Sequence, residues 1–192
     1  MKGHTLALLL LACTVSVCCQ TSRSNARQAE VVSVPDLGFR YTPPAGMTDK
    51  TSSASKQFRE HAASYSAKAA QLILDMSSDE ADTAPEWHQV WIFIFPRAQL
   101  SAVDDAEAEA KMNKALAGPR STSAGPAQNV VFAGRTFFAS EFEQKEPPLT
   151  KHAKIFTTVC KTQLVSFVLV SNSAEQVKQM ADGLSSLDFS GK

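Results

Sequence analysis

The chain has 192 residues, and its basic and acidic residues balance, with 19 of each. This balance, without a cluster of Lys and Arg, excludes the basic footprint of a nucleic-acid-binding domain. The length favours one domain rather than several.

The first 26 residues have the pattern of a cleaved secretory signal. Lys2 and His4 precede an apolar stretch from Leu6 to Cys19, and a polar strip follows it. A basic start, a short apolar stretch and a small-residue exit are what the secretion machinery recognises. The stretch is also shorter than the run of about 20 apolar residues that crosses a bilayer. We expect cleavage after Ala26, with cleavage after Cys19 as the alternative.

Residues Leu10 to Cys13 (Leu-Leu-Ala-Cys) also resemble a lipobox, in which the cysteine is acylated and becomes the new N-terminus. Acyl chains on Cys13 would anchor the protein to a membrane. The apolar stretch continues past Cys13 through Val15 and Val17, which favours the ordinary cleaved signal. A membrane-tethered lipoprotein acylated at Cys13 is the alternative, and both predict an extracytoplasmic protein, either periplasmic or secreted.

Cleavage after Ala26 changes the charge and the cysteine content. It removes Lys2 and Arg23, so that 17 basic residues face 19 acidic ones, and it leaves Cys160 as the single cysteine, which excludes an intrachain disulfide. Removing 26 residues from 192 leaves 166, enough for a domain that buries roughly 68–70% of its chain surface. We expect a short lead over 27–35 and a single domain over 36–190.

The first predicted strand is Leu37 to Tyr41, which alternates apolar and other residues and ends at a pair of prolines. Residues 51–76 fit one long helix by their apolar spacing. We favour a helix over 52–66 followed by a strand from Gln71 to Met76, because the next apolar segment needs a neighbouring strand.

That next segment, His88 to Phe95, is β-branched and aromatic throughout and predicts a strand. It is apolar on both faces, which indicates a sheet covered on both sides. The polar stretch Ser77 to Glu86 before it predicts a loop. Ser101 to Ala117 then predicts a helix, with Ser101 and Asp104 as a start resembling a capping box.

The last third of the chain predicts two hairpins and a helix. After a loop over 118–128, Val130–Phe132 and Arg135–Phe142 form a hairpin through Ala133-Gly134. Two further strands, Lys154–Val159 and Leu164–Val170, are joined through Lys161-Thr162. Ser173 starts a final helix in a capping box with Gln176, and its apolar stripe consists of Val177, Met180, Ala181 and Leu184.

These elements predict an α+β fold: an antiparallel sheet of six or seven strands with helices on its faces. Three segments in this order resemble the PsbP-like superfamily: Tyr41–Met47, Ala133–Phe137, and the closing pattern from Lys154 to Phe189. That group includes an extrinsic photosystem subunit, a nuclear relative that binds the Ran GTPase, and bacterial periplasmic lipoproteins. The resemblance covers about residues 36–190. It implies an α/β/α sandwich and a role as a binding or assembly factor.

No phosphate-binding, dinucleotide-binding, nucleophile-elbow, zincin or paired-cysteine motif is present. The mature chain carries His61, His88, His152 and Cys160, which share no metal-ligand spacing. We therefore assign no catalytic, cofactor-binding or metal-binding residue and expect no cofactor. The alternative is a small extracytoplasmic hydrolase or metal-dependent enzyme that uses His88 and His152.

The candidate interaction residues lie around the predicted loop: Asp82, Glu86, Trp87 and His88. An exposed tryptophan beside an acidic loop would suit recognition, because Trp anchors interfaces. Core packing is the role that we favour for Trp87, with recognition as the alternative. The sequence thus predicts an exported, non-enzymatic, monomeric protein that binds a protein or another component of the cell envelope.

Overall fold

The computed structural model describes residues 31–54 and 70–189. The predicted leader with Cys13, most of the helix expected over 52–66, and His61 lie outside the described residues. Residues 51–54, at the start of that predicted helix, are helical. Within the described ranges, no helix is both long enough and apolar enough to span a membrane.

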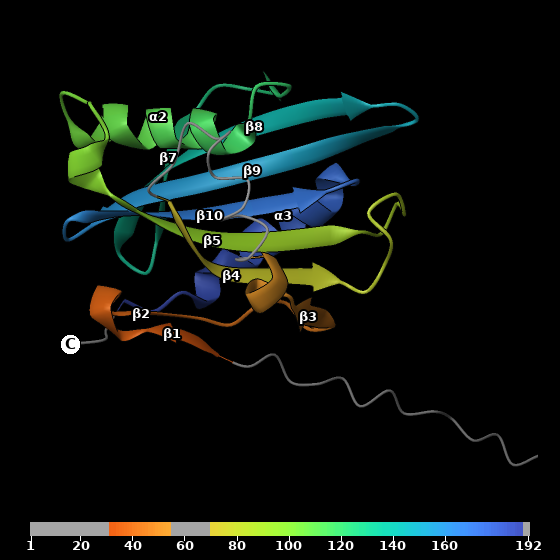
Figure 1. Cartoon of the computed structure of the whole chain (residues 1–192), viewed down its shortest axis with the longest axis horizontal. Coiled ribbons are helices and arrows are strands. Elements are labelled where there is room, and N and C mark those ends of the chain that lie inside the picture. Colours follow the sequence, from red (N-terminus) through yellow and green to blue (C-terminus); the bar gives the residue numbers. More distant parts are fainter. Residues whose placement is uncertain (1–30, 55–69, 190–192) are drawn as a thin grey trace, which may run out of the picture.

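One antiparallel sheet forms the middle layer of the molecule (Figure 1). Its strands follow the order β3-β4-β5-β10-β9-β8-β6, and β7 also pairs with β8. The long strands are β4 (Gln71–Ser78), β5 (His88–Pro96), β8 (Arg135–Glu146), β9 (Leu149–Cys160) and β10 (Gln163–Ser171). The short ones are β3 (Met47–Asp49), β6 (Thr122–Ser123) and β7 (Gln128–Phe132). A separate two-stranded sheet consists of β1 (Val32–Val34) and β2 (Phe39–Tyr41).

The predicted α+β class is confirmed, but the described residues contain more strands than the six or seven predicted. Strands β3 and β6 have three and two residues. An alternation of apolar and polar residues cannot be recognised in sequences of this length. Strand β1 lies in the segment expected to be a lead, and it pairs with β2 from Val32 opposite Tyr41 to Val34 opposite Phe39.

The pairing expected for the most apolar strand is confirmed. Strand β4 lies beside β5, from Gln71 opposite Ile94 to Ser77 opposite Gln89. On its other side, β5 pairs with β10 over its whole length. Because β5 and β10 occupy the middle of the sheet and are covered on both faces, most of the residues on each of their faces are apolar.

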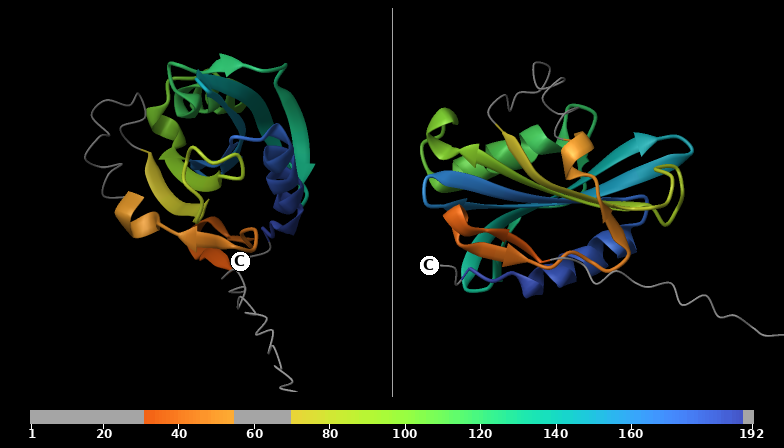
Figure 2. Two further views of the ribbon diagram at one scale, coloured as in Figure 1. Left: turned by 90° about the vertical axis from the view of Figure 1, so that its right-hand side faces the viewer. Right: turned by 60° about the horizontal axis from the view of Figure 1, so that its bottom comes forward.

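Helices cover both faces of the sheet (Figure 2). One face, here called the α2 face, packs against α2 (Asp105–Ala117). The opposite one, the α3 face, packs against α3 (Ala174–Gly183) and the β1–β2 pair. Short 3₁₀ turns connect the layers: η1 (Pro35–Leu37), η3 (Arg97–Gln99) and η4 (Leu184–Ser186).

The core of the α3 face is aromatic. Phe167 of β10 is fully buried, and its ring lies 5.8 Å from Phe39, 5.7 Å from Tyr41 and 6.1 Å from Phe137, in edge-to-face arrangements. Such pairs add to the gain from burying apolar area. The predicted stripe of α3 completes this core with Val177, Met180 and Ala181, followed by Leu184.

The core of the α2 face contains a buried polar network. Asn113 of α2 is fully buried, and its Nδ2 donates to the carbonyl oxygens of Phe138 and Ile155 and to Ser140 Oγ, at 3.0, 3.2 and 3.0 Å. Its Oδ1 accepts from Thr157 Oγ1 at 2.5 Å. A helix held by a side-chain amide over a sheet has its position fixed by hydrogen-bond geometry as well as by packing.

The predicted start of the second helix is wrong by one turn. Helix α2 begins at Asp105, and its N-cap is Asp104, whose side chain accepts from the Glu107 N–H at 2.8 Å. The carboxylate of Glu107 accepts in turn from the Val103 N–H. Aspartate is as good an N-cap residue as serine. Asp104 takes this role, and Ser101 therefore lies outside the helix. The predicted N-cap of α3, Ser173, is confirmed, since it accepts from the Gln176 N–H.

The hairpin formed by β8 and β9 is longer than the predicted strands. Strand β8 continues to Glu146 and β9 begins at Leu149, so only Pro147-Pro148 connects them. The added residues are mostly polar, which is why no apolar alternation revealed them. A cross-strand ion pair joins Glu146 and Lys151 among the added residues at 3.2 Å, and another joins Glu141 and Lys154 at the ends of the predicted strands at 2.7 Å.

Candidate functional site

Strand register places four polar residues in one row across the sheet. Ser171 of β10 lies opposite His88 of β5 on one side and His152 of β9 on the other, and His152 lies opposite Glu143 of β8. Opposed residues of antiparallel strands share a face, so all four belong to the α3 face. The two histidines are therefore separated by two strand spacings, roughly 10 Å.

Ser171 connects β10 to the start of β5 and to the start of α3 by hydrogen bonds of its side chain. It is fully buried, and its Oγ lies 2.8 Å from the carbonyl oxygen of Trp87 and 2.6 Å from Oε1 of Gln176. It also accepts from the Ser173 N–H at 3.0 Å. Among the side-chain hydrogen bonds of the described residues, none joins Ser171 Oγ to the ring of His88 or His152, so neither imidazole is placed to activate this serine.

The histidines themselves have separate partners. His88 Nδ1–H donates to the carbonyl oxygen of Glu86 at 2.8 Å, while His152 Nδ1 lies 3.4 Å from Glu143 Oε1. Residues 31–54 and 70–189 contain no group of three or more His, Cys, Asp or Glu side chains arranged to hold a metal ion. The row does not bring both histidines and a carboxylate into one pocket, which is the geometry that the enzyme alternative requires.

The predicted acidic loop is attached to the start of α3 through its backbone. Asn172 Nδ2 donates to the carbonyl oxygens of Asp82 and Ala84 at 2.9 and 2.7 Å. Gln176 Nε2 donates to the carbonyl oxygen of Glu86 at 3.1 Å. Asp82 and Glu86 are exposed, so the loop is fixed while their carboxylates face solvent.

Trp87 is not the exposed aromatic that the recognition alternative needs. Its side chain is 7% exposed and belongs to the core of the α2 face together with Phe93 and Phe95. Lys151 Nζ covers the ring at 5.3 Å from its centre. The alternation of β5 aims Trp87 into the core, and the role favoured from the sequence is the one observed.

A charged groove of about 570 Å³ lies between the β8–β9 hairpin and α3. We call it the acidic groove, because four carboxylates and two lysines line it, with one histidine. These titratable residues are Glu141, Glu143, His152, Lys154, Glu175, Lys178 and Asp182. On the hairpin side, Glu141 forms an ion pair with Lys154, and Glu143 lies beside the ring of His152.

The α3 side of the acidic groove differs from the hairpin side. Glu175, Lys178 and Asp182 are exposed, and no ion pair connects their side chains to any residue in the part of the chain that the structure describes. Complementary charge sets the specificity of an interface and its association rate. The acidic excess of the groove therefore favours a partner that presents basic groups.

Sequence reasoning missed this groove apart from His152. One signal was available, because a two-residue turn at Pro147-Pro148 would place Glu141 opposite Lys154 and Glu143 opposite His152. Opposite charges at equal distances from a turn indicate a hairpin. The α3 contribution had no such signal, since it depends on where a distant helix packs.

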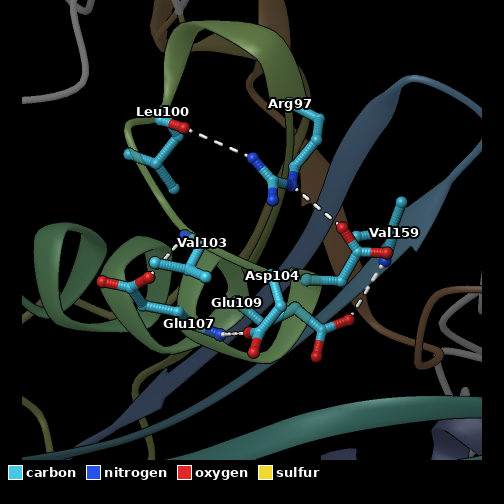
Figure 3. A network of polar contacts seen from close by, with 8 residues as sticks. Arg97, Leu100, Val103, Asp104, Glu107, Glu109 and Val159 are labelled. Atoms are coloured by element: carbon cyan, nitrogen blue, oxygen red, sulfur yellow. Dashed lines mark hydrogen bonds and ion pairs between the residues drawn. The ribbon is translucent and has the colours of Figure 1, made fainter.

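A separate, half-buried carboxylate, that of Glu109 of α2, belongs to the network of polar contacts shown in Figure 3. Its Oε1 accepts from the Val159 N–H at 3.2 Å. Burial raises the pKa of Glu109 to about 7, and the hydrogen bond from Val159 opposes part of that rise. The nearby ion pair between Arg97 and Asp105, at 3.0 Å, holds the helix start beside η3.

Comparisons with known proteins give matches among solved structures only. No protein-family model and no curated protein sequence matches the chain. The solution structure of cyanobacterial PsbP (CyanoP) from Synechocystis aligns with a TM-score of 0.55 at 14% identity, over 82% of this chain and 90% of that one. This similarity shows a shared fold, so the PsbP-like fold expected from the sequence is confirmed.

Two other solved structures are less similar. A crystal structure from Bacteroides thetaiotaomicron aligns with a TM-score of 0.47 at 11% identity, over 84% of this chain and 48% of that one. The crystal structure of LpqN, involved in cell envelope biogenesis of Mycobacterium tuberculosis, aligns with a TM-score of 0.37 at 7% identity, over 62% and 78% of the two chains.

Proposed function

We propose that this protein is exported and non-enzymatic, and that it binds a protein or another component of the cell envelope through the acidic groove. The observation that carries the proposal is the set of exposed, unpaired charges that α3 presents along that groove: Glu175, Lys178 and Asp182. The PsbP-like resemblance, supported at the level of fold by the CyanoP structure, implies a binding or assembly role.

The proposed extracytoplasmic location depends on residues 1–26, whose basic start and short apolar stretch have the pattern of a secretory signal. Mass spectrometry of the exported product tests it. A product that begins at Arg27 supports the cleaved signal, and one that begins at an acylated Cys13 supports the lipoprotein. In that second case, Cys13→Ala releases the protein from the membrane fraction. A product that stays in the cytoplasm and begins at Met1 contradicts export in either form.

The proposed surface is tested by capture from the native envelope with single charge reversals. Asp182→Lys removes an unpaired acidic group from the groove, so we expect recovery of the partner to fall about twofold to fivefold, the range of a rim charge worth up to about 1 kcal/mol. Lys178→Glu makes the groove more acidic and should raise recovery.

The matched control is Asp36→Lys, the same reversal at an exposed residue of η1. It should leave recovery unchanged. If Asp182→Lys and Lys178→Glu shift recovery in the same direction, or if Asp36→Lys lowers it equally, the acidic groove is not the binding surface.

A further inference from the structure

A second groove lies on the α2 face of strand β8, and we propose that it binds a single-chain anionic amphiphile. The acyl chain would lie between α2 and β8, with the head group at Lys114. The groove has a volume of about 1000 Å³, at the upper end of the range of about 300–1,000 Å³ typical of small-molecule sites. We call it the apolar groove. In Figure 1, α2 runs along β8 at this place.

Small side chains open the apolar groove, and aromatic rings line it. Ala110, Ala115 and Ala117 of α2 leave space where longer side chains would close onto the sheet. Phe138 and Phe142 of β8 line the opposite side and are only half-buried. A ligand chain along these rings would remove apolar area from water, which is favourable at about 25 cal/mol per Å².

The hydroxyl groups of the apolar groove already take part in internal hydrogen bonds. Ser121 Oγ donates to the carbonyl oxygen of Ala117 at 2.6 Å, and Ser123 Oγ donates to that of Gly125 at 2.8 Å. Ser140 Oγ accepts from Asn113 at 3.0 Å. The outer edge of β8 is covered as well, by β6 and β7. A peptide buried here would leave backbone groups without partners, at a cost that an alkyl chain does not incur.

The charged residues that line the apolar groove indicate that the head group of the ligand is anionic. None of the residues that line it, all within the described ranges, is Asp or Glu, and two are lysines. Lys111 is engaged, because its Nζ lies 2.8 Å from Glu107 and donates to the carbonyl oxygen of Ser101. Lys114 is exposed and has no acidic partner in the part of the chain that the structure describes. A carboxylate or phosphate head group would supply that partner.

This inference does not rest on the proposed envelope-binding role. The charged and the apolar linings come from opposite faces of β8, because Glu141 and Glu143 line the acidic groove and Phe138 and Ser140 line the apolar groove, while Phe142 borders both. A variant of the apolar groove can therefore fail to bind an amphiphile while capture through the acidic groove is unaffected.

The test uses palmitate, below its micelle concentration, and the exported form of the protein. Backbone amide NMR shifts of β8 and α2 are followed during the titration, with hexadecyltrimethylammonium as a cation of equal chain length. We expect saturable palmitate binding with shifts centred on Phe138 and Phe142, and weaker binding of the cation. Lys114→Glu should weaken palmitate binding about tenfold and reverse the preference between the two ligands. The reversal of an exposed lysine on α3, Lys178→Glu, should leave palmitate binding unchanged.

Variants that fill the apolar groove with a larger side chain test whether the acyl chain binds there. Ala110→Trp should abolish palmitate binding, and Ser123→Trp, at an exposed position of the same groove, provides a second filler if the first does not fold. The inference is overturned if palmitate causes no saturable shift, if both folded filling variants still bind it, or if an acidic peptide without an acyl chain binds where palmitate does not.

Discussion

The two faces of the central sheet are stabilised by different interactions, and each face carries a groove of the opposite character. On the α3 face, an aromatic core around Phe167 holds the layers together, and the groove beside it is charged. On the α2 face, the buried amide of Asn113 fixes the helix, and the groove beside it is apolar.

The contrast shows how one sheet can carry two grooves of different chemistry without losing its core. Apolar packing tolerates substitutions that conserve volume, whereas a buried hydrogen-bond network needs nearly fixed positions. We expect α2 to be positioned more strictly than α3, which would keep the apolar groove open between α2 and β8. The predictions below test this difference, from the largest expected effect to the smallest.

The largest effect is expected from Phe167→Ala, which removes the ring that contacts Phe39, Tyr41 and Phe137. Loss of a fully buried phenylalanine should lower the free energy of unfolding by about 3–5 kcal/mol. Chemical denaturation measures it. The control is Val131→Ala at a 65% exposed site, where we expect a change within about 0.5 kcal/mol. A loss below that seen for Asn113→Ala would mean that the aromatic core is not the main source of stability.

A smaller loss is expected from Asn113→Ala, about 2–3 kcal/mol, because it leaves buried polar groups with fewer partners. Thr157 Oγ1 keeps its contact with Ser166 Oγ at 2.7 Å. A double-mutant cycle with Thr157→Val separates this interaction from simple packing. If the network acts as a unit, the two losses will not add. Additive losses would contradict the role of the amide in positioning α2.

The smallest effect concerns pH and is confined to the α2 face. The pKa of Glu109 rises in the folded state from 4.5 to about 7, so its stabilising contribution is complete below pH 4.5 and is lost as the pH rises through about 7. Glu109→Gln retains an acceptor for the Val159 N–H and should be more stable than the wild type at pH 8, by about 1 kcal/mol after allowance for solvent screening. The two proteins should be equally stable at pH 4.

The control for this profile is Glu107→Gln on the same helix. The hydrogen bond and charge of Lys111 lower the pKa of Glu107, so its contribution is present above the unfolded pKa and is lost as the pH falls. Glu107→Gln should therefore reduce stability at pH 8 instead of increasing it. Thermal unfolding at pH 4 and pH 8 distinguishes the two variants, and a gain in both would refute the assignment to Glu109.

The fold was predictable where an element is determined by residues close together in the sequence. The segment from His88 to Phe95, which is apolar on both faces from Val90 onward, predicts a central strand, and Ser173 with Gln176 predicts the start of α3. The outer half of the β8–β9 hairpin was not predictable from either strand alone. The polar residues from Glu143 to Glu146 fit a strand only when Leu149 to His152 are known to lie opposite them, and that information comes from a second strand.

The sites were less predictable than the fold for the same reason. The row of His88, Ser171 and His152 depends on β10 lying between β5 and β9, an order that no local pattern specifies. Trp87 was assigned correctly to the core because strand alternation is local. Each groove combines one strand segment with a helix far away in the chain, so its composition becomes visible only when the layers are assembled.

The alternation of β8 has a consequence for how the two surfaces can change over evolutionary time. Odd-numbered positions such as Glu141 and Glu143 line the acidic groove, and even-numbered positions such as Phe138 and Ser140 line the apolar groove. A point substitution can therefore alter the lining of one groove while the neighbouring residue preserves the lining of the other. An insertion of one residue would exchange the two linings, so we expect homologues to diverge here by substitution and to conserve the length of this segment.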